Sequence, residues 1–376
     1  MSIVTCIVPN YNHARFLPER LDSILEQTRM PDEIILLDDT SSDNSRDIIQ
    51  QYAERYPDLI TCHFNEENSG SPFAQWKKGV DLASGEFIWL AESDDVADPR
   101  FLETLVPMLD ADPKVGVAYC QSHTIDEEGK NLGDMHFWTD ALDTERWKSC
   151  YTNDGNEECV RYVSRRNTIP NASAVLFKKS AYDCVGSWPL SFRLAGDWLV
   201  WVSMLKKYDI SYTPEKLNYY RYHGGTVRSQ TSNIGNRAES WWIQQYVMRE
   251  FAMSSRSKFM LASQQLQHID PSLPVLSKES NPNVVIEHYK KNLSELFSQM
   301  NEKLAKGCVD DKDIYLPLAA LLVDYGNKYY SAGKRKTARR YYLASLDYNF
   351  YSARMFLFLV STYVPLLRKL TGKFIR

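Results

Sequence analysis

The chain has 376 residues, of which 44% are hydrophobic and 24% are charged, and its formal net charge is −4. This composition predicts a globular protein with an ample core, and the net charge excludes a chain that binds nucleic acid through an overall basic surface. The seven cysteines are odd in number and show no CxxC spacing. This pattern favours structural thiols in a reduced compartment over a disulfide framework or a zinc site.

Residues 3–119 alternate short apolar runs with segments of helical periodicity. The runs predicted as strands are residues 3–8, 33–37, 60–64, 87–91 and 115–119, and the predicted helices are residues 16–27, 43–56, 72–83 and 99–109. Such alternation is typical of βα units that form a parallel sheet. We therefore predict an α/β, Rossmann-like sheet, mostly parallel and flanked by helices.

Polar residues directly follow most of the predicted strands. They are Asn10 and Tyr11 after the first, Asp38 and Asp39 after the second, Asn68 after the third, and Asp94 and Asp95 after the fourth. The carboxyl ends of parallel strands meet at one edge of a sheet, where folds of this kind bind ligands. We expect these side chains to surround one binding site, because chance would scatter them over both edges.

The adjacent carboxylates Asp94 and Asp95 are the most informative of these pairs. They lie shortly after the apolar run 87–91, and their charges repel each other unless a positive charge offsets them. A divalent cation that carries phosphates would supply that charge. The alternative is a solvated turn in which an aspartate caps the helix that begins at Pro99.

Two common nucleotide-binding motifs are missing from the sequence. No GxGxxG follows the first predicted strand, which argues against a dinucleotide-dependent dehydrogenase. No GxxxxGK[ST] occurs either, which argues against a P-loop phosphotransferase. The chain opens with Met1-Ser2 and then a strand-like run, and it has no apolar stretch long enough to span a bilayer. We therefore expect no signal peptide and a cytoplasmic location.

Long helical patterns replace the alternation beyond residue 230, and we place a domain boundary between residues 1–232 and 233–376. Residues 325–342 follow the spacing of one tetratricopeptide-like helix pair. The tail of residues 334–376 has ten Lys or Arg and one acid, Asp347. Its apolar segment 355–367 suits an interfacial helix on the cytoplasmic face of an anionic membrane, or a last helix that packs on the core.

Six motifs in this order resemble the inverting family 2 glycosyltransferases with the GT-A fold, over residues 1–230. They are Val8-Pro9-Asn10-Tyr11-Asn12, Leu37-Asp38-Asp39 with Ser41-Ser42-Asp43, Asn68-Ser69-Gly70, Glu92-Ser93-Asp94-Asp95, Gly196-Asp197-Trp198 and Tyr220-Arg221-Tyr222-His223. The resemblance implies a GT-A nucleotide-sugar-binding and catalytic domain in residues 1–232, followed by a helical C-terminal region.

The resemblance also implies roles for residues at the predicted sheet edge. Tyr11 would lie against the nucleotide base, and Asp39 would accept a hydrogen bond from the imide N–H of uracil or thymine. Asp94 would bind the ribose hydroxyls, and Arg221 would offset phosphate charge. The expected nucleotide-sugar-binding set is Pro9, Asn10, Tyr11, Asp39, Asn68, Gly70, Asp94 and Arg221.

The cation and the general base complete the expected site. Asp95 and His223 would hold Mg²⁺ or Mn²⁺, although His223 could equally be a histidine of a polar loop. Asp197 would take the proton of the acceptor hydroxyl. Without the resemblance, an aspartate at a helix start is more often a cap. Many family members carry glutamate before this aspartate, and Gly196 stands there in this chain.

The implied activity is transfer of a sugar from a UDP- or dTDP-type donor to a hydroxyl of a glycan or lipid-linked acceptor, with inversion, in the biosynthesis of a cell-envelope polysaccharide. The expected partners are the donor, the acceptor and an anionic membrane surface, but no nucleic acid. A non-catalytic sugar-nucleotide-binding or glycan-binding module is the main alternative. A nucleotidyltransferase is a third interpretation, but that class usually has a glycine-rich loop after its first strand, and residues 10–15 contain no glycine.

Overall fold

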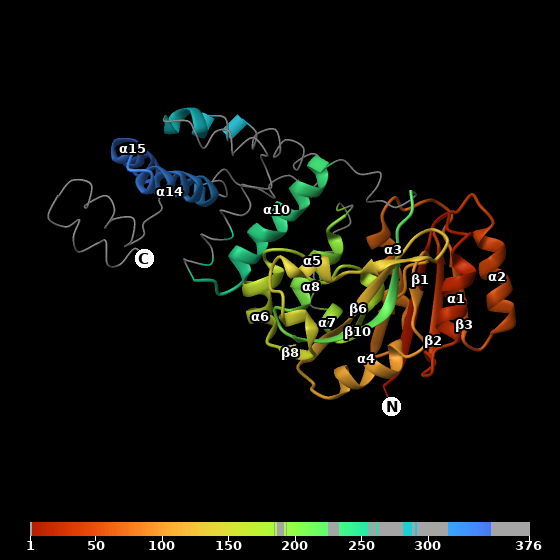
Figure 1. Cartoon of the computed structure of the whole chain (residues 1–376). Coiled ribbons are helices and arrows are strands. Elements are labelled where there is room, and N and C mark those ends of the chain that lie inside the picture. The colour runs from red at the N-terminus through yellow and green to blue at the C-terminus, as the bar shows by residue number, and fades with distance from the viewer. Residues whose placement is uncertain are drawn as a thin grey trace. The chain divides into compact units, whose positions relative to one another are not determined.

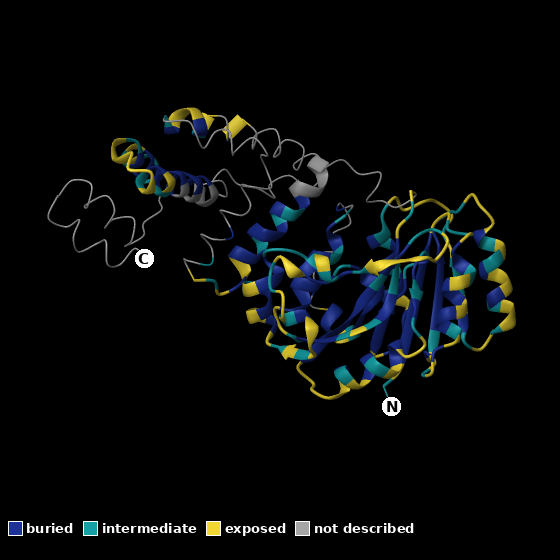
Figure 2. Cartoon of the chain, viewed as in Figure 1, coloured by how far each residue is buried: buried dark blue, intermediate teal, exposed yellow. Residues whose placement is uncertain are grey.

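The computed structural model of the chain describes residues 2–183, 185, 192, 194–224 and 233–254, and farther along residues 257, 261, 281–287, 290–291 and 315–346. The chain forms two compact units, Met1–Thr231 and Ser232–Arg376. The N-terminal unit is a sheet covered by helices, and its strands are mostly buried while exposed residues lie on the outer helices and loops (Figures 1 and 2).

One mixed sheet organises the N-terminal unit. Its strands are β1 Val4–Asn10, β2 Glu33–Asp38, β3 Ile60–Phe64, β4 Phe87–Leu90, β5 Val96–Ala97, β6 Val115–Ile125, β7 Asn131–Asp134, β8 Tyr151–Asn153, β9 Val175–Lys178 and β10 Asp209–Arg221. The order is β3-β2-β1-β4-β9-β6-β10-β5, with β7 beside β6 and β8 beside β10. The first four strands in this order are mutually parallel, and β9 is antiparallel to both its neighbours.

Helices cover both faces of this sheet. They are α1 Leu17–Leu25, α2 Ser45–Arg55, α3 Pro72–Leu82, α4 Phe101–Asp110, α5 His136–Asp140, α6 Gly155–Glu158, α7 Lys179–Tyr182 and α8 Gly196–Met204. The short helices η1 Arg146–Lys148, η2 Cys159–Val163 and η3 Ala172–Ala174 lie between strands. The predicted helices 16–27, 43–56, 72–83 and 99–109 correspond to α1 to α4, each within a few residues at its ends.

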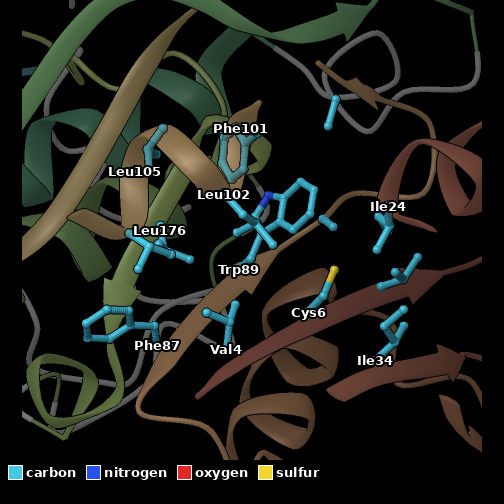
Figure 3. Packing of buried hydrophobic residues seen from close by; sticks show 14 of the residues in the cluster. Val4, Cys6, Ile24, Ile34, Phe87, Trp89, Phe101, Leu102, Leu105 and Leu176 are labelled. Carbon is cyan, nitrogen blue, oxygen red and sulfur yellow. The ribbon is translucent and has the colours of Figure 1, made fainter. Parts of the chain in front are cut away.

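Alternation along β1 divides the core into two layers. Val4, Cys6 and Val8 belong to a buried cluster that also contains apolar residues of α1, α2 and α4 (Figure 3). Ile7 faces the other way, towards α3, where a Cβ added to Gly79 would lie 2.4 Å from Ile7 Cγ2. Glycine at position 79 therefore lets α3 approach β1 closely.

The predicted α/β fold is confirmed, but β5, β7, β8, β9, β10 and the second half of β6 were not predicted. The run 115–119 is only the first half of β6, which continues to Ile125. The longest strand, β10, was not recognised, because its polar residues interrupt the apolar pattern. β10 pairs with β5 directly after the Asp94-Asp95 pair, so it brings the segment around residue 220 to that pair.

The C-terminal unit contains α10 Asn233–Glu250, α14 Tyr315–Ser331 and α15 Arg335–Leu346. Tyr341 packs on the rings of Tyr325 and Tyr329, and a Cβ on Gly326 would lie 2.4 Å from the ring of Tyr342. α14 and α15 thus pack against each other, and the tetratricopeptide-like character of residues 325–342 stays a prediction. The predicted amphipathic segment 355–367 lies outside the described residues. Within the described part of the chain, no helix is long and apolar enough to cross a membrane.

Candidate functional site

The carboxyl ends of β1 and β2 form one side of the candidate site. Asn10 ends β1 opposite Asp38 of β2, and its amide donates to Asp38 at 3.3 Å. The chain then turns through left-handed backbone at Asn12 (φ 56°) and at Thr40 (φ 65°). Asparagine tolerates this conformation, whereas it is unfavourable for the β-branched Thr40, and such strained residues concentrate at functional sites. Tyr11 lies between Asn10 and Asn12 in the sequence, and 50% of its surface is exposed.

Asp39 is the centre of a buried hydrogen-bond network. Its Oδ1 accepts hydrogen bonds from Asn65 Nδ2, Ser69 N and Gln75 Nε2, and its Oδ2 accepts one from Ser69 Oγ at 2.7 Å. A carboxylate oxygen can accept about two hydrogen bonds. Oδ2 therefore retains acceptor capacity for a ligand donor, while Oδ1 is saturated.

The predicted loop residues Asn68 and Gly70 support this network. Asn68 Nδ2 donates to the carbonyl of Asp39 at 2.7 Å, and Asn68 Oδ1 accepts from Gly70 N at 2.8 Å. Gly70 has a φ of 69°, which glycine adopts without strain. These hydrogen bonds bring Asp39, Asn68 and Gly70 together, and their role in binding a nucleotide stays a prediction. Buried Pro9 lies in β1 opposite Leu37 of β2.

Asp94 forms a compact cluster with two histidines. His223 Nε2 lies 2.9 Å from Asp94 Oδ2, and His13 Nδ1 lies 2.8 Å from Ser93 Oγ. One ligand atom from each of His13, Asp94 and His223 lies within 4.8 Å of the others. Two imidazoles and a carboxylate suit Mn²⁺ and related first-row ions, whereas Mg²⁺ favours an all-oxygen site. The donor set therefore fits a divalent cation, with Mn²⁺ ahead of Mg²⁺.

The pKa values of the two neighbouring aspartates shift in opposite directions. Burial alone would raise the pKa of Asp94, but the hydrogen bond to His223 and the charge of His13 lower it below its usual value. Burial and the negative charge of Asp94 raise the pKa of Asp95. Burial also lowers the pKa of His13. Asp94 is therefore the more readily ionised of the two carboxyl groups.

The predicted role of Asp95 as the cation ligand does not fit this arrangement. Its side chain is 2% exposed. Asp95 Oδ1 accepts the backbone N–H of Arg221 at 3.0 Å, and the carboxyl group also interacts with the side chain of Ser173. Asp95 therefore holds the end of β10 against β5, while the adjacent Asp94 meets the histidines. The prediction named His223 but missed His13, which lies only three residues beyond β1.

The predicted role of Arg221 in offsetting phosphate charge also needs correction. Arg221 is 1% exposed, and its guanidinium donates to the carbonyls of Asp94 and Asp126 and to the carboxylate of Glu19. Donors already used inside the protein cannot reach a phosphate without breaking these bonds. Arg221 instead fixes the loop that carries Asp94.

Hydrogen bonds connect Glu92, in the acidic segment after β4, to α3 and to Ser173 of η3. Trp76 Nε1 donates to Glu92 Oε1 at 2.7 Å, and Glu92 N donates to Ser173 Oγ at 3.1 Å. Burial and the charge of Asp94 raise the pKa of Glu92 to about 8. Because Trp76 lies on α3, this helix connects the end of β4 to the Asp39 network, which contains Gln75 of the same helix.

Asp197 lies in the first turn of α8, where the helix dipole favours a negative charge. Asn167 Nδ2 donates to Asp197 Oδ2 at 2.8 Å and so orients the carboxylate. The backbone of Asn167 also accepts a hydrogen bond from Trp138 Nε1 of α5 at 2.7 Å. Asn167 carries no recognisable signal in the sequence, because its role depends on a contact 30 residues away.

Because Gly196 has no side chain, α8 packs closely against Phe73 of α3. A Cβ at this position would lie 2.5 Å from the ring of Phe73 on α3. The aromatic ring therefore occupies the space that a larger side chain at position 196 would need. Through Phe73, Gln75 and Trp76, α3 contacts the segments that carry Asp197, Asp39 and Glu92.

This close contact leads to a first prediction. Gly196→Ala should lower the free energy of unfolding by about 1–3 kcal/mol, because the added methyl group overpacks the contact with Phe73. Chemical denaturation of wild type, Gly196→Ala, Phe73→Leu and the double variant measures the effect. The two substitutions should be non-additive, with the double variant more stable than the sum of single losses implies. Additive losses would show that the two residues do not interact.

Comparison with known proteins gives matches to one family. The model of glycosyl transferase family 2 matches residues 5–186. An uncharacterised glycosyltransferase, alr2836, of Nostoc sp. is 29% identical over 238 residues, which cover 63% of this chain and 70% of that protein. Residues 5–186 contain every site residue described above except those in α8, Arg221 at the end of β10 and His223 after it.

Solved structures share the fold at low sequence identity. TarS residues 1–349 of S. aureus, in complex with UDP-GlcNAc, matches with a TM-score of 0.56 at 14% identity and covers 92% of this chain and 91% of that chain. The mannosyltransferase PcManGT of Pyrobaculum calidifontis, in complex with GDP-Man and Mn²⁺, matches with a TM-score of 0.51 at 16% identity. That match covers 92% of this chain and 87% of that chain.

Proposed function

We propose, because the chain belongs to glycosyl transferase family 2 and is a glycosyltransferase, that it transfers a sugar with inversion. The proposed donor is of the UDP or dTDP type, and the proposed acceptor is a hydroxyl of a glycan or of a lipid-linked molecule. The observation that carries the proposal is the cluster of His13, Asp94 and His223 at the carboxyl edge of the sheet. The partly exposed Tyr11 follows the neighbouring strand. Tyr11 would form a site for the base, and the cluster with its cation would form a site for the diphosphate. These two sites lie at the ends of the adjacent strands β1 and β4 and match the two parts of a nucleotide sugar.

The choice of nucleotide rests on Asp39 and Tyr11. The fold neighbours were solved in complex with UDP-GlcNAc and with GDP-Man, so the fold alone does not select the base. Asp39 Oδ2 accepts only one hydrogen bond from the described residues. It can therefore accept one more from the imide N–H of uracil or thymine. The exposed ring of Tyr11 would stack on the same base.

The cation proposed for this site is Mn²⁺ or Mg²⁺, held by Asp94 with His13 and His223. When bound, it would offset negative charge on the departing nucleoside diphosphate. Arg221 keeps the Asp94 loop in place, and Asp95 anchors the same loop to the end of β10. These residues thus set the position of the ligands before any nucleotide arrives.

Asp197 is the proposed general base. The acceptor hydroxyl would attack the anomeric carbon, its proton would pass to Asp197, and the bond from the anomeric carbon to the diphosphate oxygen would break in the same displacement. Attack from the face opposite the leaving group inverts the configuration. Asn167 holds the carboxylate through Oδ2, so that proton acceptance needs no rearrangement of the side chain.

A thermal-shift panel tests the donor class. UDP or dTDP with Mn²⁺ should raise the unfolding midpoint, because a ligand at 100 times its Kd stabilises the folded state by about 2.7 kcal/mol. The shift should disappear when EDTA removes the cation, and GDP and ADP should give much smaller shifts. Equal shifts for purine and pyrimidine nucleotides would contradict the role of Asp39. No shift with any nucleotide would contradict the proposed function.

A further inference from the structure

Arg20 is an unusual charge in the middle of α1. Its side chain is 0% exposed, and Nε, Nη1 and Nη2 have no hydrogen-bond partner among the described residues. Burial of a charge without hydrogen bonds is strongly unfavourable, and apolar replacements of buried charges are often neutral or stabilising. The position of Arg20 therefore needs an explanation other than its contribution to stability.

Arg20 packs against Trp89 of β4, three residues before Glu92. Its guanidinium carbon is 4.9 Å from the centre of the Trp89 ring. Trp89 lies opposite Cys6 of β1 in the sheet, and the two are neighbours in the buried layer (Figure 3). Trp89 Nε1 donates to the carbonyl of Ser173 at 2.9 Å. Ser173 in turn holds Glu92, so the stacked guanidinium supports the residues that carry the acidic cluster.

Other residues of α1, and Gln27 just beyond it, also form hydrogen bonds along the acidic segment 92–98 and to Arg221. Ser23 Oγ accepts the N–H of Ala97, and Gln27 Nε2 donates to the carbonyl of Asp98 at 2.7 Å. Glu19 is bound to Arg221, which also holds the carbonyl of Asp94. These contacts place Arg20 on the side of α1 that runs along residues 92–98. Burial lowers the pKa of the Arg20 guanidinium, and Cys6, Asp95, Glu92 and Asp94 oppose this shift through their charges.

We propose that Arg20 is a positioning residue that supplies a fixed counter-charge near Glu92, Asp94 and Asp95 and so balances the affinities of the site for a cation and for a nucleoside diphosphate. The inference rests on the proposed function. A buried positive charge repels a divalent cation near it and attracts the diphosphate. Loss of that charge should therefore change the two affinities in opposite directions.

The test replaces Arg20 by methionine, which keeps the length and apolar character of the stacked side chain. Mn²⁺ alone is titrated by electron paramagnetic resonance, and UDP is titrated by calorimetry at saturating Mn²⁺, both with the full chain. Arg20→Met should tighten Mn²⁺ binding and weaken UDP binding, each by roughly threefold to tenfold.

Two further variants control for structural effects. Arg20→Lys keeps the charge and should leave both affinities within about twofold of wild type. Arg146 forms an ion pair with buried Glu158 and stacks between the rings of Tyr151 and Tyr162, away from the acidic cluster. Arg146→Met should lower the unfolding midpoint and leave both affinities unchanged.

The outcomes separate the two proposals. Opposite changes in the two affinities for Arg20→Met support the counter-charge. Weaker binding of both Mn²⁺ and UDP with a lower unfolding midpoint would assign Arg20 a structural role and overturn the inference. Unchanged affinities would overturn it as well. A wild-type chain that binds neither Mn²⁺ nor UDP would refute the proposed function itself, and the inference would fail with it.

Discussion

Replacing Asp197 by asparagine should lower the rate of sugar transfer by a factor on the order of 10²–10⁴, the usual contribution of a positioned general base. Asparagine has the same shape, and its carbonyl oxygen can still accept the hydrogen bond that Asn167 donates to Oδ2. Only the ability to take a proton is lost. Donor affinity should therefore remain near the wild-type value, while turnover falls.

Transfer rates and nucleotide affinities of the same preparations measure this effect. Asp154→Asn is a matched control, because Asp154 caps the remote helix α6 by accepting the N–H of Glu157 at 2.9 Å. That variant should keep its turnover. Near-normal turnover of Asp197→Asn would refute its role as base. Equal losses of turnover and donor affinity would assign Asp197 to binding.

Replacing Asp94 by asparagine should weaken Mn²⁺ binding by about 100-fold or more. Changes to groups that merely support a metal ligand typically reduce affinity about 10–100-fold, so loss of a charged ligand should have at least the upper effect. UDP binding should weaken with it, because the proposed cation links the diphosphate to the protein. Titration of Mn²⁺ in the absence and presence of UDP measures both effects.

Asp95→Asn separates the two neighbouring aspartates. Its carbonyl oxygen can still accept the backbone N–H of Arg221, so Mn²⁺ affinity should fall far less than in Asp94→Asn. A larger loss for Asp95→Asn would restore the prediction made from the sequence and contradict the role of Asp94 as the cation ligand.

The arrangement of the first strands could be predicted from the sequence because it is a local property. The apolar runs 33–37, 60–64 and 87–91 lie within one or two residues of β2, β3 and β4. Parallel strands that alternate with helices leave few alternatives for the edge at which polar residues gather. The position of Asp39 and Asp94 after the carboxyl ends of parallel strands followed from this rule.

The finer chemistry of the site depends on contacts that no local pattern records. Which of Asp94 and Asp95 faces the histidines depends on β10, which pairs with β5 and places Arg221 N on Asp95. Arg221 was expected to face phosphate because its burial cannot be read from its neighbours in the sequence. Arg20 was not singled out, because an arginine on an amphipathic helix is usually solvated.

The proposed chemistry depends above all on Asp94, which with His13 and His223 would hold the cation that binds the diphosphate. Crystals of the chain grown with UDP and Mn²⁺ test this role directly through the anomalous signal of manganese. We predict one peak at about 2.2 Å from an oxygen of Asp94 and near an imidazole of the cluster. A manganese peak bound to Asp95 instead, or UDP bound elsewhere, would contradict it.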